Sequence, residues 1–168
     1  MAKIYETRMT AEIEGDFVVF LIGVRLNKPW KFWKWWPVVT AMPRMLIELG
    51  KRPELGLMHA RTHFGLRNTL VVQYWRSFEH LHAYSTDREF EHLPAWKAFN
   101  KAVDVNGDVG IWHETFLVPD GAYENIYGNM PAYGMGLAGT LHEAAGRRRS
   151  AKGRLQRTDG ADHPVLEA

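Results

Sequence analysis

Cysteine is absent from this 168-residue sequence, and its absence removes several classes of function at once. Disulfides, thiolate metal sites, iron–sulfur clusters and a cysteine nucleophile are all excluded. A chain without cysteine is also compatible with a reducing compartment. Residues 1–16 show no apolar core followed by a small-residue cleavage site. We therefore expect no signal peptide and a cytoplasmic location.

Long hydrophobic runs are also missing. The longest, FVVFLIGVRL at residues 17–26, is interrupted by Arg25 and falls well short of the roughly 20 apolar residues of a membrane-spanning helix. Its β-branched and aromatic residues instead indicate a central strand that is buried on both faces.

Several catalytic motifs are absent as well. The sequence contains neither HExxH nor GxSxG, and the glycines of YGMGLAG do not follow a strand–helix unit of the dinucleotide-binding type. His59 and His63 are four residues apart, but they lie in a predicted strand rather than on a helix. The sequence therefore predicts no metal site and no flavin or nicotinamide site.

Positive charge is concentrated near the end of the chain. The net charge is +2, and RRRSAKGRLQR at residues 147–157 holds six of the 21 lysines and arginines. This run lacks the interleaved aromatic residues of a nucleic-acid-binding segment, so we expect no nucleic-acid partner. Its alanine, glycine and charge content predicts a disordered basic tail over residues 146–168, with contact to acidic lipid as the alternative.

The hydrophobic pattern changes period in the order strand, helix, strand, strand, helix, strand. Strands are predicted at 17–26, 56–64, 69–76 and 109–118. One helix has an apolar face from Trp35 to Leu49 with Pro37 in its first turn, and Ser77 is the predicted N-cap of the second. This order predicts an α+β, ferredoxin-like βαββαβ domain with an antiparallel sheet over residues 1–125, followed by an extended arm at 126–145. The helices cover only one face of the sheet, so a homodimer is expected to cover the other.

Four of the seven tryptophans fall within PWKFWKWWP at residues 29–37. Trp35 continues into the apolar face of the first helix and is predicted to be a core residue. Trp30, Phe32 and Trp33 are predicted to wall a pocket mouth or a partner contact, with Lys31 and Lys34 in solvent. Peripheral membrane contact is the minor alternative, because the run is short and bounded by prolines, whereas an amphipathic anchor continues its own periodic face.

The polar residues of the strands suggest a pocket. Alternation places His59, Arg61 and His63 on one face of the second strand. If the histidine-bearing faces of the strands coincide, one aromatic pocket is lined by His59, Arg61, His63, Gln73, Trp75 and His113, as suits a small molecule. His113 or His63 would then take a proton, and Arg61 with Gln73 would stabilise an oxyanion. The alternative is that these side chains serve the dimer interface without chemistry.

His92 precedes LPAW in the second helical region. A single imidazole beside an apolar cavity suffices as an axial haem ligand, so haem is the alternative to a cofactor-free site. The other interpretation of His92 is a surface or helix-capping residue.

Six stretches resemble a little-characterised bacterial and fungal family allied to the antibiotic-biosynthesis-type monooxygenases. They are RLNKPWKFWKWWPVVTAMPRML, LGLMHARTHFG, VVQYWRSFEHLHAYS, HLPAWKAFN, GDVGIWHETFLV and YENIYGNMP, which together cover most of residues 15–131. The most specific parts are YWRSFEHLHAYS with HLPAW, and GIWHETFLVP. The resemblance implies a ferredoxin-like protomer that dimerises through its sheets as a dimeric α/β barrel, with a pocket between sheet and helices.

The wider superfamily contains cofactor-free oxygenases of activated aromatic or polyketide substrates. It also contains haem proteins that degrade haem or dehydrate aldoximes, with an iron-binding histidine in a region that His92 approximately matches. We therefore expect a monooxygenase-type enzyme for a hydrophobic aromatic, polyketide or terpenoid-like substrate. The predicted catalytic residues are His113, Arg61 and His63, and the predicted substrate contacts are His59, Gln73, Trp75, Trp33 and Phe32. A haem protein using His92 and a non-catalytic ligand-binding dimer are the alternatives.

Overall fold

The computed structural model describes residues 2–87, 90 and 107–155 of the chain. The chain divides into two compact units, one of residues 18–116 and one that joins residues 1–17 to residues 117–168. The first unit contains a four-stranded sheet, and the second contains a two-stranded sheet. Within the described ranges, no helix is both long enough and apolar enough to cross a membrane.

The four-stranded sheet has the strand order β3–β4–β2–β5. Its strands are β2 (Phe17–Leu26), β3 (Leu57–Phe64), β4 (Asn68–Trp75) and β5 (Val109–Val118). β4 pairs antiparallel with both β2 and β3, and β5 lies at the far side of β2. This is the strand order of a ferredoxin-like βαββαβ fold, so the predicted α+β fold class and the four predicted strands are confirmed.

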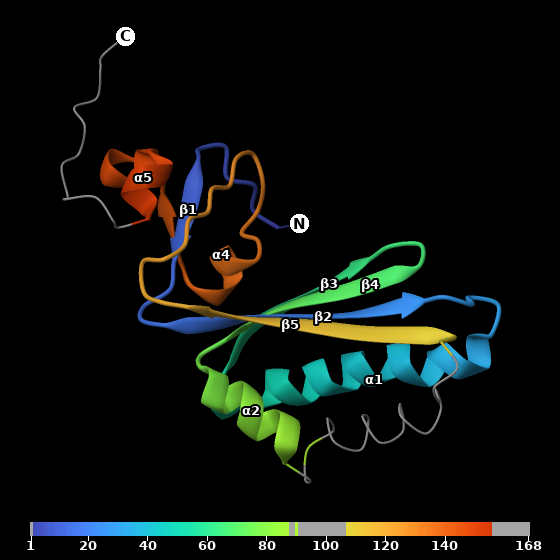
Figure 1. Ribbon diagram of the computed structural model, residues 1–168. Coiled ribbons are helices and arrows are strands. Elements are labelled where there is room, and N and C mark those ends of the chain that lie inside the picture. The colour runs from blue at the N-terminus through green and yellow to red at the C-terminus, as the bar shows by residue number, and fades with distance from the viewer. Residues whose placement is uncertain (1, 88–89, 91–106, 156–168) are drawn as a thin grey trace. The chain divides into compact units, whose positions relative to one another are not determined.

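Two helices cover one face of this sheet, α1 (Phe32–Lys51) and α2 (Phe78–Thr86) (Figure 1). The core between them and the sheet contains Val18, Ala41, Met45, Leu49, Trp75, Leu81 and Tyr84. A second cluster lies nearer the start of α1, where Val38 and Val109 pack with the partly buried Trp35. Trp35 is therefore a core residue, as predicted, and its indole N–H donates to the Pro29 carbonyl at 2.8 Å.

α1 begins earlier than predicted. The helix starts at Phe32, so Pro37 lies in its interior rather than in its first turn. The buried residues Val38, Ala41, Met45 and Leu49 recur every three or four positions, as the sequence pattern indicates. A tryptophan-rich segment has no strong stop signal between the two prolines of residues 29 and 37, which is why the helix extends back through it.

α2 begins where the sequence predicts. The Ser77 hydroxyl accepts a hydrogen bond from the His80 N–H at 3.4 Å, which is N-cap geometry. A short 3₁₀ helix, η1 (Pro53–Leu55), connects α1 to β3 through Gly56, whose φ is +85°. The His80 ring packs directly on Gly56, because a Cβ at that position would lie 2.5 Å from the ring. His80 is therefore a structural residue.

The other unit is held by β1 (Met9–Glu12), which pairs antiparallel with β6 (Thr140–Glu143). The Asn125 side chain extends this pairing, because its amide accepts from the Ala11 N–H and donates to the Ala11 carbonyl, at 2.7 and 2.9 Å. The Tyr123 hydroxyl similarly accepts from the Ile13 N–H at 2.7 Å and donates to the Ile13 carbonyl at 3.0 Å. These two residues of YENIYGNMP thus fix β1.

The end of the chain differs from the prediction. Residues 126–145 are only partly extended, because they include the short helix α4 (Met135–Ala138) as well as β6. Residues 146–155, predicted to be disordered, contain η3 (Gly146–Arg149) and α5 (Ala151–Arg154). Arg148 forms two hydrogen bonds to Glu12, at 2.7 and 2.9 Å, so this arginine of the basic run is paired with an acid that is distant in sequence. Composition alone does not reveal that pairing.

Candidate functional site

The register of the sheet assigns each side chain to one of two faces, because directly paired residues of an antiparallel ladder point the same way. Val18 pairs with Trp75, and both lie in the core beneath α1. Two residues further along, Phe20 pairs with Gln73, so this pair shares that face by alternation. We call it the helix face and the opposite one the outer face.

Three side chains form a row on the helix face. Phe20 on β2 lies between Gln73, its partner on β4, and His113 on β5, whose ring centroid is 5.6 Å from that of Phe20. Adjacent strands are about 4.8 Å apart, so the backbones of Gln73 and His113 are separated by about 10 Å. His113 is exposed. Across the strands β5, β2 and β4, the row therefore presents an imidazole, an aromatic ring and an amide side by side.

Trp75 holds the Gln73 amide, at one end of the row, in a fixed orientation. Trp75 and Gln73 are almost fully buried, and the Trp75 indole N–H donates to Gln73 Oε1 at 2.8 Å. The Gln73 amide nitrogen lies 3.9 Å from the Met42 sulfur on α1, a weak contact. Because the strong bond orients the Gln73 amide, its N–H groups are directed away from Trp75. Trp75 is thus a support for Gln73 as well as a core residue.

The single pocket predicted from the sequence is not formed, because the two histidine-bearing faces do not coincide. On β3, His59 pairs with Tyr74 and His63 pairs with Leu70, while Gln73 pairs with Ala60. His59, Arg61 and His63 therefore share the outer face, whereas His113, Gln73 and Trp75 lie on the helix face. Alternation correctly grouped the three β3 residues, but it gives no register between strands, and the register separates them from His113.

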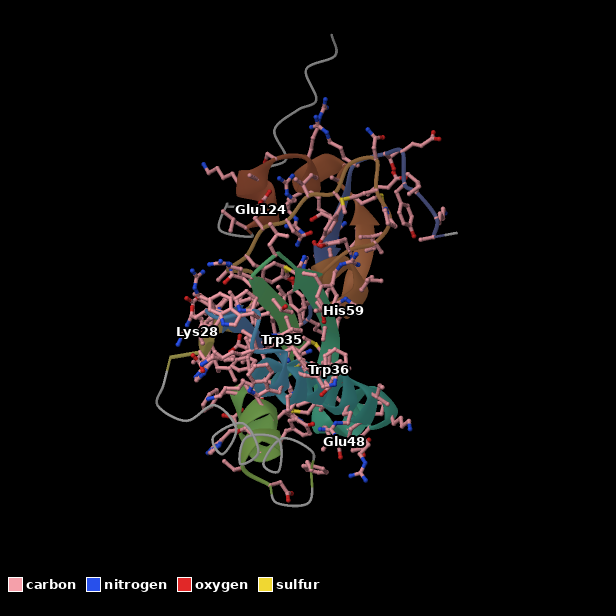
Figure 2. The ribbon with its side chains drawn as sticks, turned by 90° about the vertical axis from the view of Figure 1, so that its right-hand side faces the viewer. Lys28, Trp35, Trp36, Glu48, His59 and Glu124 are labelled. Carbon is pink, nitrogen blue, oxygen red and sulfur yellow. The ribbon has the colours of Figure 1, made fainter. Side chains whose placement is uncertain are left out.

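His59 is the most constrained of the outer-face residues. Burial and, secondarily, the nearby Arg61 guanidinium hold the pKa of His59 below its usual value of 6.5. Its Nε2 atom is buried and has no hydrogen-bond partner among the described residues. This ring nitrogen is therefore an unsatisfied buried polar atom within the described part of the chain. Figure 2 labels His59.

The rest of the outer face is mostly apolar. Cross-strand pairing and alternation place Val19, Leu21, Leu70 and Val72 in its centre. Trp112 on β5 belongs to the same face, because its indole lies against Gly23, where an added Cβ would be 2.4 Å from the ring. Trp112 and Phe116 are substantially exposed. This face is an apolar surface with a basic edge along β3.

Phe32 and Trp33 are not brought to His113. Both are about three-fifths exposed on α1, where their rings pack edge to face at 5.4 Å. Lys31, next to them in sequence, contacts Asp108 at the start of β5. His113 follows five residues later, about 16 Å further along the strand. A direct substrate contact from this aromatic pair and His113 together is therefore not supported.

An acid that the sequence interpretation missed organises the loop before α1. Asp108 is almost fully buried, and the ammonium groups of Lys28, Lys31 and Lys34 lie 2.6, 2.8 and 3.4 Å from its carboxylate. These three cations hold the pKa of Asp108 well below its ordinary value. The prediction that Lys31 and Lys34 lie free in solvent is wrong. The only signal was the spacing of three between the lysines, which places them on one side of a turn or helix. Figure 2 shows Lys28 near the start of α1.

Among the described residues, no group of three or more histidine, aspartate or glutamate side chains could hold a metal ion. His92, the haem ligand of the alternative interpretation, lies outside the described residues, as does the HLPAW segment that contains it.

The chain was compared with known proteins. A curated relative, monooxygenase af470 of Aspergillus fumigatus, is 28% identical over an alignment of 151 residues, and the match covers 77% of this chain and 53% of the relative. The chain thus spans about half the length of the curated relative that it matches. Two of the solved structures that resemble this chain each cover 60% of it. SnoaB, a cofactor-independent oxygenase from Streptomyces nogalater, is 12% identical with a TM-score of 0.44 and 91% of its chain covered. A dimeric ferredoxin-like protein from a Jannaschia species is 17% identical with a TM-score of 0.45 and 97% covered.

The family model described as Monooxygenase af470-like matches residues 17–135, from the first strand of the four-stranded sheet to the start of α4. The matched range includes the whole row of Gln73, Phe20 and His113 and also Tyr123 and Asn125. On this match, the chain belongs to the Monooxygenase af470-like family.

Proposed function

We propose that the protein is a monooxygenase-type oxidoreductase that acts on a hydrophobic aromatic, polyketide or terpenoid-like molecule at the helix face of the sheet. The observation that carries this proposal is the row of His113, Phe20 and Gln73. It combines a proton acceptor, an aromatic side chain and an oriented amide within the span of a two-ring molecule. Family membership supplies the reaction type.

The chemistry follows from the residues of the row. A methylene group activated by neighbouring carbonyl or phenolic rings loses a proton to the His113 imidazole. The resulting anion gives its electrons to dioxygen and forms a carbon–oxygen bond, which yields a hydroperoxide after a proton returns. Loss of water converts this hydroperoxide to a carbonyl. One oxygen atom enters the product and the other leaves as water, so the substrate supplies every electron.

Gln73 is placed to stabilise the negative charge of the intermediate anion. Its amide is oriented by Trp75, and a substrate that displaces the weak contact with the Met42 sulfur would meet an N–H group able to donate to a developing enolate oxygen. This assignment replaces Arg61, which lies on the outer face. Because the reaction balances without an added electron donor, we propose that no flavin, nicotinamide or haem takes part.

The outer face is proposed to form a homodimer interface. Its apolar centre at Leu21 and Val72 suits a second copy of the same sheet, and His59, Arg61 and His63 would lie at the edge of that interface. Val72→Glu is expected to convert the dimer to a monomer by light scattering, whereas a wild-type monomer would contradict the proposal.

The reaction is tested with a phenolic probe that carries a methylene between two aromatic rings. Purified protein without a visible absorption band is expected to consume one dioxygen for each carbonyl formed, with one labelled atom in the product when labelled dioxygen is used. A Soret band that tracks with activity would contradict the cofactor-free mechanism. Absence of oxygen uptake across a panel of such phenols and polyketides would contradict the monooxygenase proposal itself.

A further inference from the structure

The outward side of α1 is apolar along most of its length. Trp33, Trp36, Pro43 and Ile47 are exposed and recur at helical spacing, and Thr40 occupies the position between them. We call these five residues the α1 stripe. Trp33, Trp36 and Ile47 are each 59% exposed. The hydroxyl of Thr40 donates to the Trp36 carbonyl at 2.9 Å, so this polar group is satisfied within the helix.

Such a surface is unusual for a helix that already has a buried face. α1 packs Val38, Ala41, Met45 and Leu49 against the sheet, so the opposite side would ordinarily be polar. Instead the α1 stripe is continued at its N-terminal end by Trp30 and Phe32, which are 65% and 62% exposed. A contiguous exposed patch of large apolar side chains indicates a binding surface. Figure 2 marks Trp36 on this helix.

The length of the α1 stripe answers the argument against membrane contact that was drawn from the sequence. A membrane anchor must continue its own periodic face, and PWKFWKWWP alone is too short to do so. Because α1 starts at Phe32 and runs to Lys51, Trp33, Trp36 and Ile47 belong to one continuous helix. The proline at position 37 lies inside that helix and does not end it.

Charge around the α1 stripe is positive. Lys28, Lys31 and Lys34 surround the single carboxylate of Asp108, which leaves an excess of positive charge, and their side chains are 42%, 31% and 25% exposed. Arg44 is exposed beside the stripe. Glu48, the one acid within α1, accepts a hydrogen bond from Tyr84 of α2. Basic residues next to exposed tryptophans are the chemistry that anionic lipid headgroups and the adjoining acyl region bind.

We propose that the α1 stripe docks the protein onto an anionic lipid surface, with α1 lying in the plane of the headgroups. Trp33, Trp36 and Ile47 enter the boundary between headgroups and acyl chains, and Arg44 reaches the lipid phosphates. The net positive charge of the three lysines around Asp108 attracts the anionic surface at longer range. This surface lies on the far side of α1 from the helix face, and the sheet-to-sheet dimer uses the outer face. Docking is therefore independent of the proposed reaction and of the proposed dimer.

The test uses the full chain and unilamellar vesicles of phosphatidylcholine with or without phosphatidylserine, separated by flotation. The wild-type protein is expected to float with phosphatidylserine vesicles and to be released by high salt. Trp33→Ala combined with Trp36→Ala is expected to lower the partition coefficient at least about tenfold. Ile47→Glu, which is remote from the tryptophans, is expected to act in the same direction, and melting curves check that each variant folds.

A matched control removes two exposed apolar side chains elsewhere in the same unit. Phe64 and Leu66, at the turn between β3 and β4, are 80% and fully exposed, so Phe64→Ala with Leu66→Ala deletes a comparable apolar surface. This control is expected to float like the wild type. Equal flotation of all variants, no flotation of the wild type, or equal loss in the control would each overturn the proposal. A change in molar mass of the α1 variants without lipid, with flotation unchanged, would instead identify the stripe as a contact between copies and also overturn it.

Discussion

The rings of Phe20 and His113 lie 5.6 Å apart, on the face of the sheet that also carries α1. Phe20 is paired across the strands with Gln73, so this one contact places an imidazole and an amide on the same face. His59, Arg61 and His63 are on the opposite face. The chain therefore separates its polar residues into a row that can hold a substrate and an edge that can serve an interface.

The bond between Trp75 and Gln73 is expected to contribute to stability through burial. Trp75→Phe leaves Gln73 Oε1 buried without its donor and should lower the free energy of unfolding by about 1–3 kcal/mol. Gln73→Leu alone leaves the Trp75 indole N–H buried without an acceptor, and should lower the free energy of unfolding in the same way. The double variant removes both polar groups, so its loss should be smaller than the sum of the two single losses. Urea unfolding measures all three, and strictly additive losses would contradict the coupling.

Asp108 is expected to make stability depend on pH. Its pKa in the folded protein lies below the ordinary value of 3.8, because of hydrogen bonds from Lys28, Lys31 and Lys34. A carboxyl with a depressed folded pKa stabilises the fold above its unfolded pKa and loses that contribution as the pH falls towards the folded pKa. The melting temperature of the wild type should therefore fall more steeply below about pH 4 than that of Asp108→Asn. The exposed Asp120→Asn should keep the wild-type slope, and an unchanged slope in Asp108→Asn would refute the assignment.

Glu12 is expected to protect the basic run from proteolysis. Its carboxylate accepts two hydrogen bonds from Arg148 and lies 3.4 Å from Arg147, and the Arg148 bond is the main reason that the pKa of Glu12 is lowered. Glu12→Gln should increase the rate of tryptic cleavage within residues 147–149 several-fold, because η3 loses its charged partner. Glu143→Gln, an exposed acid at the end of β6, is the control. Identical cleavage rates in Glu12→Gln and the control would show that the pair does not hold the segment.

The fold of the larger unit was predictable because its hydrophobic periods are strong. The strand at 17–26 and the strand at 109–118 agree with β2 and β5, and Ser77 caps α2 as its sequence position indicates. The start of α1 was not predictable, since propensity does not decide between a loop and a helix in a segment dominated by tryptophan. The β1–β6 pair was also missed. It joins four-residue strands that are far apart in sequence, and the side chain of Asn125 helps to hold one of them.

The sequence predicted which residues could take part in the candidate site, but not which of them share a face of the sheet. Alternation within a strand correctly kept His59, Arg61 and His63 together. Only the pairing of β4 with β2 and β3 shows that Gln73 shares the helix face with Phe20, whereas those three residues lie on the outer face. Asp108 was missed for a related reason, since its partners Lys28, Lys31 and Lys34 precede it by more than 70 residues and no local pattern connects them.

The most direct test of the account is the turnover number of His113 variants with the methylene-bridged phenolic probe, measured as oxygen uptake. If His113 takes the proton, His113→Ala and His113→Gln should each lower kcat by about 100-fold or more, and added imidazole should restore part of the His113→Ala activity. His82→Gln, an exposed histidine on α2, should leave oxygen uptake at the wild-type rate. Wild-type kcat in both His113 variants would contradict the central claim that the helix face carries the chemistry.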